Sequence, residues 1–202
     1  MPKITFFNLN IEKREKIKKA IINEFSKHTI AKASISNIVE EAQIPRGSFY
    51  QYFEDKEDAL KYIIDEFIKI EKEEIKNSLK INNGDIFKTS IDIFKYVSKK
   101  SYNDTDMMLC NNIIQKLKEE NVNIFEGINC KSMYQANKDN GNIINTNILK
   151  INNEEDLKYM MKILTVVIRA SIVDVITKKK SEEKAQEELQ KQIEILKQGM
   201  IK

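Results

Sequence analysis

Apolar residues recur at every third or fourth position along nearly the whole chain of 202 residues. This spacing places them on one face of an α-helix, and the two-residue alternation of a half-buried strand is almost absent. Only five glycines and two prolines interrupt the pattern, so few turns separate long helices. Because 41% of the residues are hydrophobic, each helix has an apolar face to bury. The pattern predicts an all-α fold of one large domain or two small ones.

Residues that favour helix N-caps mark where the predicted helices begin. Asn10, Ser34, Asp55, Asn153 and Ser181 each stand just before an apolar periodic run, where their side chains satisfy free backbone N–H groups. Proline is also suited to the first turn of a helix, and Pro45 is expected there. These signals predict helices over residues 10–27, 34–42, 45–53, 56–80, 85–100, 104–120, 123–138, 153–176 and 181–200. The Asn-rich stretch 139–153 is expected to form a long connection.

Several function classes are excluded by what the sequence lacks. No apolar run approaches the ~20 residues of a membrane span, and the N-terminus lacks the features of a secretory signal. Cys110 and Cys130 are too few for a disulfide framework and suit a reducing cytoplasm. With His28 as the single histidine, and no catalytic triad, phosphate-binding loop or metal-ligand spacing, we expect no cofactor and no enzymatic activity. The net charge is only +3, so nucleic-acid binding requires a local surface.

The segment from Ser34 to Lys56 predicts a helix-turn-helix, because a short helix, a tight turn and a second short helix follow one another. In that motif the second helix enters the major groove of DNA. Phe49 and Phe53 lie four residues apart and are expected to face the core, which leaves polar residues outside. Arginine and glutamine side chains there have the geometry to recognise guanine and adenine edges. The residues expected to contact DNA are Ser34, Ser36, Asn37, Pro45, Arg46, Gly47, Ser48, Tyr50, Gln51, Tyr52 and Lys56.

Some of these residues have a second interpretation. Tyr50 and Tyr52 could be packing aromatics rather than phosphate contacts. Ser36 and Asn37 could cap or solvate their own helix, and Lys56 is one lysine among many, although its position at a helix start favours a phosphate contact.

Residues 33–60 (ASISNIVEEAQIPRGSFYQYFEDKEDAL) resemble the N-terminal DNA-binding domain of TetR/AcrR-family transcriptional regulators. The match extends over these 28 of the 202 residues with ordered spacing. Gln43 departs from the family pattern, because it stands where the turn glycine is usual; it would carry a backbone penalty if the turn requires a positive φ. Ile30 and Ala31 replace a glycine–tyrosine pair. The stretch from Phe6 to Arg14 resembles the extended first helix of some members.

The resemblance implies about nine helices: an N-terminal three-helix DNA-binding domain at residues 1–55, and an effector-binding and dimerisation domain at 56–202, linked by helix 56–80. It also implies a homodimer formed by the last two helices, and the nearly all-round apolar character of residues 157–176 agrees with this. The expected dimer contacts are Leu164, Ile168, Ile172, Val175, Leu189, Ile193 and Leu196. Candidate effector contacts are Tyr96, Tyr102, Met107, Cys110, Phe125, Met133 and Arg169, although ordinary core packing is an alternative for each and an ion pair is favoured for Arg169.

The function implied is a ligand-responsive repressor that binds a palindromic double-stranded DNA operator as a homodimer and responds to a small-molecule effector. The alternative is a protein that organises or tethers DNA with the same recognition helix and responds to no small molecule.

Overall fold

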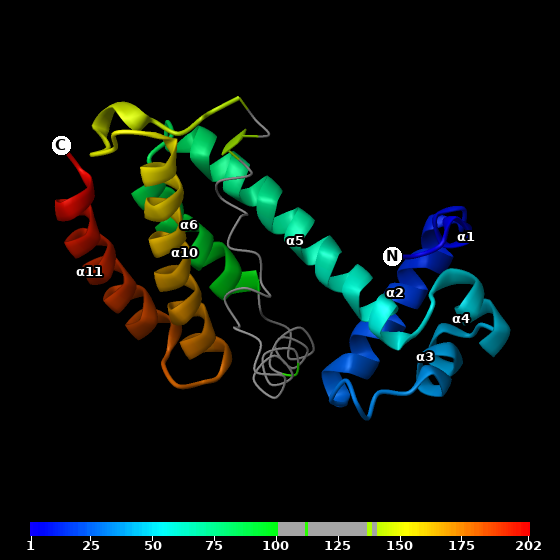
Figure 1. The fold of residues 1–202 in the computed structure, drawn as a ribbon. Helices are drawn as coiled ribbons and strands as arrows, with labels where there is room; N and C mark the ends of the chain where they lie inside the picture. The colour runs from blue at the N-terminus through cyan, green and yellow to red at the C-terminus, as the bar shows by residue number, and fades with distance from the viewer. Residues whose placement is uncertain (101–111, 113–136, 139–140) are drawn as a thin grey trace. The chain divides into compact units, whose positions relative to one another are not determined.

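The computed structural model describes residues 1–100, 112, 137–138 and 141–202. In this part of the chain it contains eight α-helices, one 3₁₀ helix and no strand, which confirms the all-α prediction (Figure 1). The expected helices at 104–120 and 123–138 fall almost wholly outside the described residues. The elements are α1 (Ile4–Phe7), α2 (Ile11–Lys27), α3 (Ile35–Ala42), α4 (Arg46–Tyr52), α5 (Lys56–Ile81), α6 (Ile86–Lys100), η1 (Thr146–Ile148), α10 (Glu154–Ile176) and α11 (Glu182–Met200).

The predicted N-caps are confirmed, because each side chain accepts a backbone N–H from the first turn of its helix. One feature differs from the resemblance: α1 is a separate single turn rather than an extension of the next helix. The cause is Asn10, whose side-chain oxygen accepts the backbone N–H of Lys13 at 2.8 Å and so begins α2 anew.

The chain divides into two compact units, and α5 contributes to both, with the division inside this helix between Ile68 and Lys69. In unit 1, α2 packs on α3, α3 packs on α4, and α1 packs on α4. The core of unit 1 is rich in aromatic side chains, with Phe6, Phe25, Phe49 and Phe53 fully buried. The short helices α3 and α4 are therefore held by tertiary packing, which helices of this length need.

In unit 2, α6, α10 and α11 pack on one another (Figure 1). The residues of α5 that belong to this unit contribute Ile75 and Leu79 to the core. The Asn-rich connection contains η1. Leu149 in this connection forms an isolated antiparallel β-bridge with Ile201, just after α11. Gly84 has φ +77°, and a Cβ there would lie 2.3 Å from the carbonyl oxygen of Ile143. The Asn-rich connection therefore packs so closely against residue 84 that only glycine fits at this position. None of the helices in the described part has the length and apolar character needed to cross a membrane.

Candidate nucleic-acid interface

The short helix α4 has one buried face and one exposed face. Phe49 is fully buried, as is Phe53 just after the helix, which confirms that this pair faces the core. Four residues of the opposite face are exposed, together with Pro45 at the N-cap, and Ser48 is half-buried. The four exposed residues are Arg46, Gly47, Tyr50 and Gln51. The helix thus presents a polar face to solvent from a rigid apolar base.

The turn before α4 has the left-handed backbone that the sequence analysis considered. Gln43 has φ 54° and ψ 47°. Residues other than glycine adopt this backbone conformation at a cost in conformational energy. Two hydrogen bonds stabilise it: Gln43 N–H donates to Glu40 O at 3.1 Å, and Ile44 N–H donates to Val39 O at 3.0 Å. This C-cap ends α3 and sets the direction in which α4 begins.

Arg46 joins the exposed ends of the two short helices. Its Nη1 donates a hydrogen bond to Ser36 Oγ at 2.8 Å, and both residues are exposed. A guanidinium carries five N–H donors, so this bond leaves others for a second partner. Ser36 and the four exposed residues of α4 therefore form one polar surface, which we call the recognition surface (Ser36, Arg46, Gly47, Tyr50 and Gln51).

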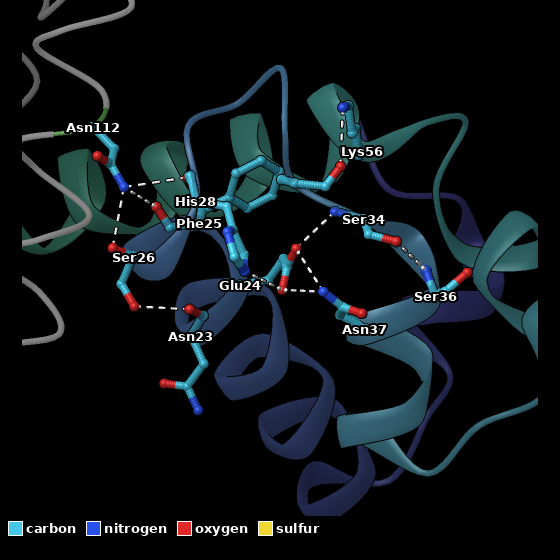
Figure 2. Close-up of polar contacts among 11 residues, drawn as sticks. Asn23, Glu24, Phe25, Ser26, His28, Ser34, Ser36, Asn37, Lys56 and Asn112 are labelled. Carbon is cyan, nitrogen blue, oxygen red and sulfur yellow. Dashed lines mark hydrogen bonds and ion pairs between the residues drawn. The ribbon is translucent and has the colours of Figure 1, made fainter.

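The buried carboxylate of Glu24 holds the first helix of the helix-turn-helix through hydrogen bonds (Figure 2). Glu24 on α2 is only 4% exposed, and its Oε1 accepts the backbone N–H of Ser34 at 2.7 Å. Both of its carboxylate oxygens accept from Asn37 Nδ2, at 3.2 and 3.1 Å, and His28 Nε2 lies 4.0 Å from Oε2. Glu24 thus ties the start of α3 to α2, and it engages the amide nitrogen of Asn37 and the backbone of Ser34.

Glu24 was not among the expected site residues, although the sequence contained a signal for it. Glu24 stands seven residues after Ile17 and three after Ile21, in the stripe of α2 that also buries Phe25. A carboxylate at such a core position must find hydrogen-bond donors, because burying an unpaired charge is costly.

Lys56, at the start of α5, donates from Nζ to the carbonyl oxygens of Ala31 at 3.1 Å and Ala33 at 3.0 Å. It therefore holds the connection between α2 and α3. An ammonium group has three N–H donors, so a phosphate contact by the third stays a prediction.

A second set of polar contacts is made at the C-terminal end of α2, just before the connection that Lys56 holds. Asn112, which unit 1 includes, donates from Nδ2 to the carbonyl oxygens of Phe25 at 2.8 Å, Ser26 at 3.1 Å and His28 at 3.2 Å. These carbonyls end α2, where the last turn leaves acceptors without partners inside the helix. Figure 2 shows Asn112 approaching the end of α2. No sequence pattern pointed to this residue, because its partners lie more than 80 positions away.

The structure corrects one expected DNA contact. Tyr52 is only 6% exposed, and its ring lies 6.1 Å from that of Phe6. It points to the side of α4 that packs against α1, so its alternative interpretation as a packing aromatic applies.

Four of the seven expected dimer contacts on α10 and α11 are corrected, and the other three stay a prediction. Leu164, Ile168, Leu189 and Ile193 are buried in the core of unit 2. Ile172, Val175 and Leu196 are half-buried and pack against the same core. The apolar stripe that the sequence revealed is thus used within the chain. The opposite face of α10 retains apolar residues at least partly open to solvent: Tyr159, Ile163, Val166, Ala170 and Val173.

Two of the candidate effector residues lie among the described residues. Tyr96 on α6 is half-buried, and Arg169 on α10 is only 8% exposed. Burial raises the pKa of Glu71 on α5, and the positive charge of Arg169 opposes that rise. Tyr102, Met107, Cys110, Phe125 and Met133 lie outside the described residues.

A pocket of about 500 Å³ in unit 2 has a different lining, which contains neither Tyr96 nor Arg169. Asn137, Asn142, Ile144, Asn153, Glu154 and Leu157 are part of this lining. The pocket therefore gives no support to the candidate effector residues.

Comparison with known proteins agrees with this geometry. Residues 17–63 match the family model described as bacterial regulatory proteins, tetR family. Residues 85–200 match the model described as tetracyclin repressor-like, C-terminal domain. No curated protein sequence matches the chain significantly.

Solved structures share the fold at low sequence identity. A TetR-family regulator described as putative, from Mesorhizobium loti MAFF303099, has a TM-score of 0.65 at 10% identity, covering 95% of this chain and 98% of that one. The dihydroxyacetone kinase operon activator DhaS has a TM-score of 0.59 at 13% identity, covering 96% and 100%. The multidrug binding protein EbrR, complexed with imidazole, has a TM-score of 0.51 at 14% identity, covering 90% of each chain.

Proposed function

Because the chain belongs to the TetR family of bacterial transcriptional regulators, we propose that it is a repressor that binds a palindromic operator as a homodimer and releases it when a small effector binds. The observation that supports DNA binding most directly is the recognition surface: α4 exposes Arg46, Tyr50 and Gln51 while its other face is fixed in the core. A rigid polar helix of this kind suits insertion into the major groove, and the cytoplasm is where such a DNA partner lies.

Each of these side chains in and near α4 has a proposed role that follows from its chemistry. The guanidinium of Arg46 suits the two acceptors of guanine, and the amide of Gln51 suits adenine. Gly47 carries no side chain, and apart from its chain neighbours and the backbone of its own helix no atom lies within 4 Å of the Cβ position there, so the helix can approach the DNA closely. Tyr50, Ser48 and the third donor of Lys56 are suited to phosphate oxygens, which fix the register of a protein on the duplex.

We propose that the dimer forms through the free apolar face of α10. Tyr159, Ile163, Val166, Ala170 and Val173 follow one another at spacings of four and three residues, so they form a continuous stripe. Ile163 is 43% exposed within the single chain. Two copies related by two-fold symmetry would bury this stripe and place two recognition helices on half-sites about 34–36 Å apart or a multiple of that distance.

The effector is proposed to bind in unit 2, which contains the helices α6, α10 and α11. Arg169 and Glu71 bring charge into this unit, and EbrR, a relative in fold, is named as a multidrug binding protein. The ligand needs only to bind better to the conformation that fits DNA poorly. Because DhaS is named an operon activator, the direction of regulation requires its own test.

The first experiment selects duplexes from a random-sequence library with the full-length protein and measures affinities by fluorescence anisotropy. Arg46→Ala is expected to weaken binding to the selected duplex by about tenfold and to relax base preference, since one bidentate contact discriminates by about 1–3 kcal/mol. Lys19→Ala, which removes an exposed positive charge from α2, is the control. Sequence-specific DNA binding is refuted if the wild-type protein enriches no sequence, and the role of Arg46 is refuted if Arg46→Ala and Lys19→Ala behave alike.

Two further measurements separate the alternatives. Transcription in vitro from a promoter overlapping the selected site should fall when the protein is added; a rise would indicate an activator. A small-molecule library should contain compounds that lower the affinity for the selected duplex. If no compound in the library changes the affinity for DNA, the DNA-organising alternative is favoured over a response to an effector.

A further inference from the structure

The carbonyl groups at the C-terminal end of α4 are all bonded. An α-helix leaves its last four carbonyls without partners inside the helix, and in α4 these belong to residues 49–52. Phe49 O accepts the backbone N–H of Phe53 at 2.8 Å. The other three carbonyls accept from residues near the N-terminus of the chain rather than from the turn that follows α4.

Lys3 and Thr5 supply these three hydrogen bonds. Lys3 donates twice, from Nζ to Tyr50 O at 2.8 Å and from its backbone N–H to Tyr52 O at 2.8 Å. Thr5 Oγ1 donates to Gln51 O. The ammonium of Lys3 also lies at the negative end of the α4 dipole, where a positive charge is favourable.

The donors are anchored by the next residue of α1. Phe6 is fully buried, and its ring centroid lies 4.9 Å from that of Phe53 and 5.1 Å from that of Tyr62. Phe6 therefore fastens the segment to the base of α4 and to α5. The backbone of Lys3 and the side chain of Thr5 are thus held at the helix end by a buried neighbour.

We propose that Lys3 and Thr5 are positioning residues that set the base preference of the recognition helix without contacting a base themselves. This inference rests on the proposed DNA-binding function. The carbonyls that they hold belong to Tyr50, Gln51 and Tyr52, and two of these residues lie in the recognition surface. If the last turn of α4 frays, the side chains of Tyr50 and Gln51 lose their fixed direction, whereas Arg46 at the other end keeps its bond to Ser36.

The test uses Thr5→Val and Lys3→Met in the full-length protein. Thr5→Val keeps the shape of the side chain but removes the hydroxyl donor, and Lys3→Met keeps the apolar stem but removes the ammonium. Each should lower the ratio of affinities for the selected duplex and for sheared mixed-sequence DNA by about fivefold, the effect of one lost hydrogen bond. Hydrogen exchange at the amides of Gln51–Phe53 should quicken, and the salt dependence of binding to mixed-sequence DNA should stay unchanged.

Matched variants make the outcome decisive. Thr5→Ser and Lys3→Arg retain a donor and should restore both the affinity ratio and the slow exchange, whereas Lys19→Met removes an exposed lysine elsewhere in unit 1 and should change neither. Equal losses on both DNAs, with a salt slope lower by about one, would show that Lys3 contacts phosphate and would overturn the proposal. Unchanged ratios in both Thr5→Val and Lys3→Met would also overturn it. If the wild-type protein selects no sequence, the proposed function fails instead.

Discussion

Replacing the buried carboxylate of Glu24 tests how the helix-turn-helix is held together. Glu24→Ala removes the acceptor of the Ser34 backbone N–H and of the Asn37 side-chain amide. Hydrogen bonds to a charged group contribute about 1.5–3 kcal/mol, and a donor left unpaired away from water costs about 1–3 kcal/mol. Because Ser34 is half-buried and Asn37 is exposed, Ser34 N–H carries most of the penalty. We expect the free energy of unfolding to fall by about 3 kcal/mol.

Asn37→Ala is the matched control, since it removes the amide donor and leaves the carboxylate bonded to Ser34. Its expected loss is about 1 kcal/mol. Urea unfolding followed by circular dichroism at 222 nm measures both variants, and hydrogen exchange at the amides of α3 locates the effect. Equal losses in Glu24→Ala and Asn37→Ala would refute the reasoning, because the bond to the Ser34 backbone would then contribute nothing.

Three other predictions concern the turn, the interior of unit 2 and the dimer. Gln43→Gly should raise the midpoint of thermal unfolding, because relief of the left-handed strain, about 1 kcal/mol, outweighs the added chain entropy; a lower midpoint would contradict this. The raised pKa of Glu71 means that the folded chain binds its proton more tightly than the unfolded chain, so stability decreases as pH rises above the ordinary value of 4.5. Glu71→Gln should flatten that decrease in thermal scans at several pH values, and an unchanged slope would contradict it. Ile163→Asp should yield monomers in sedimentation velocity, whereas Ile195→Asp on α11, which is 69% exposed outside the stripe, should leave the dimer intact; a dimeric Ile163→Asp would reject the α10 interface.

The local architecture of this protein could be predicted from its sequence. The N-caps at Asn10, Ser34, Asn153 and Ser181 involve groups within three residues of one another, so the sequence alone brings donor and acceptor together. The same holds for the core side of α4, because Phe49 and Phe53 are separated by one helical turn. The family pattern, with its glycine at this position, raised the question of a left-handed backbone at Gln43, and only the structure showed that the turn adopts one.

Which face of a helix stays free was decided only by the tertiary structure. The stripe containing Leu164 and Ile168 was recognised as apolar, but its partner turned out to be the same chain. Tyr52 was expected to face solvent, and the packing of α1 against α4 buried it. The periodicity of a sequence shows that one face of a helix is apolar. It does not show which element packs against that face, because the packing partner can be far away in the chain.

Long-range hydrogen bonds were likewise beyond the sequence. Glu24 stood at a core position of α2, yet its partners on α3 were set by how the two helices cross. The bonds from Lys3 and Thr5 to the carbonyls of α4 span more than 40 residues. Spacing and composition determined the helices and the polar face of the DNA-binding motif, whereas packing determined how that face is held, because a hydrogen bond forms only where the fold brings its two atoms together.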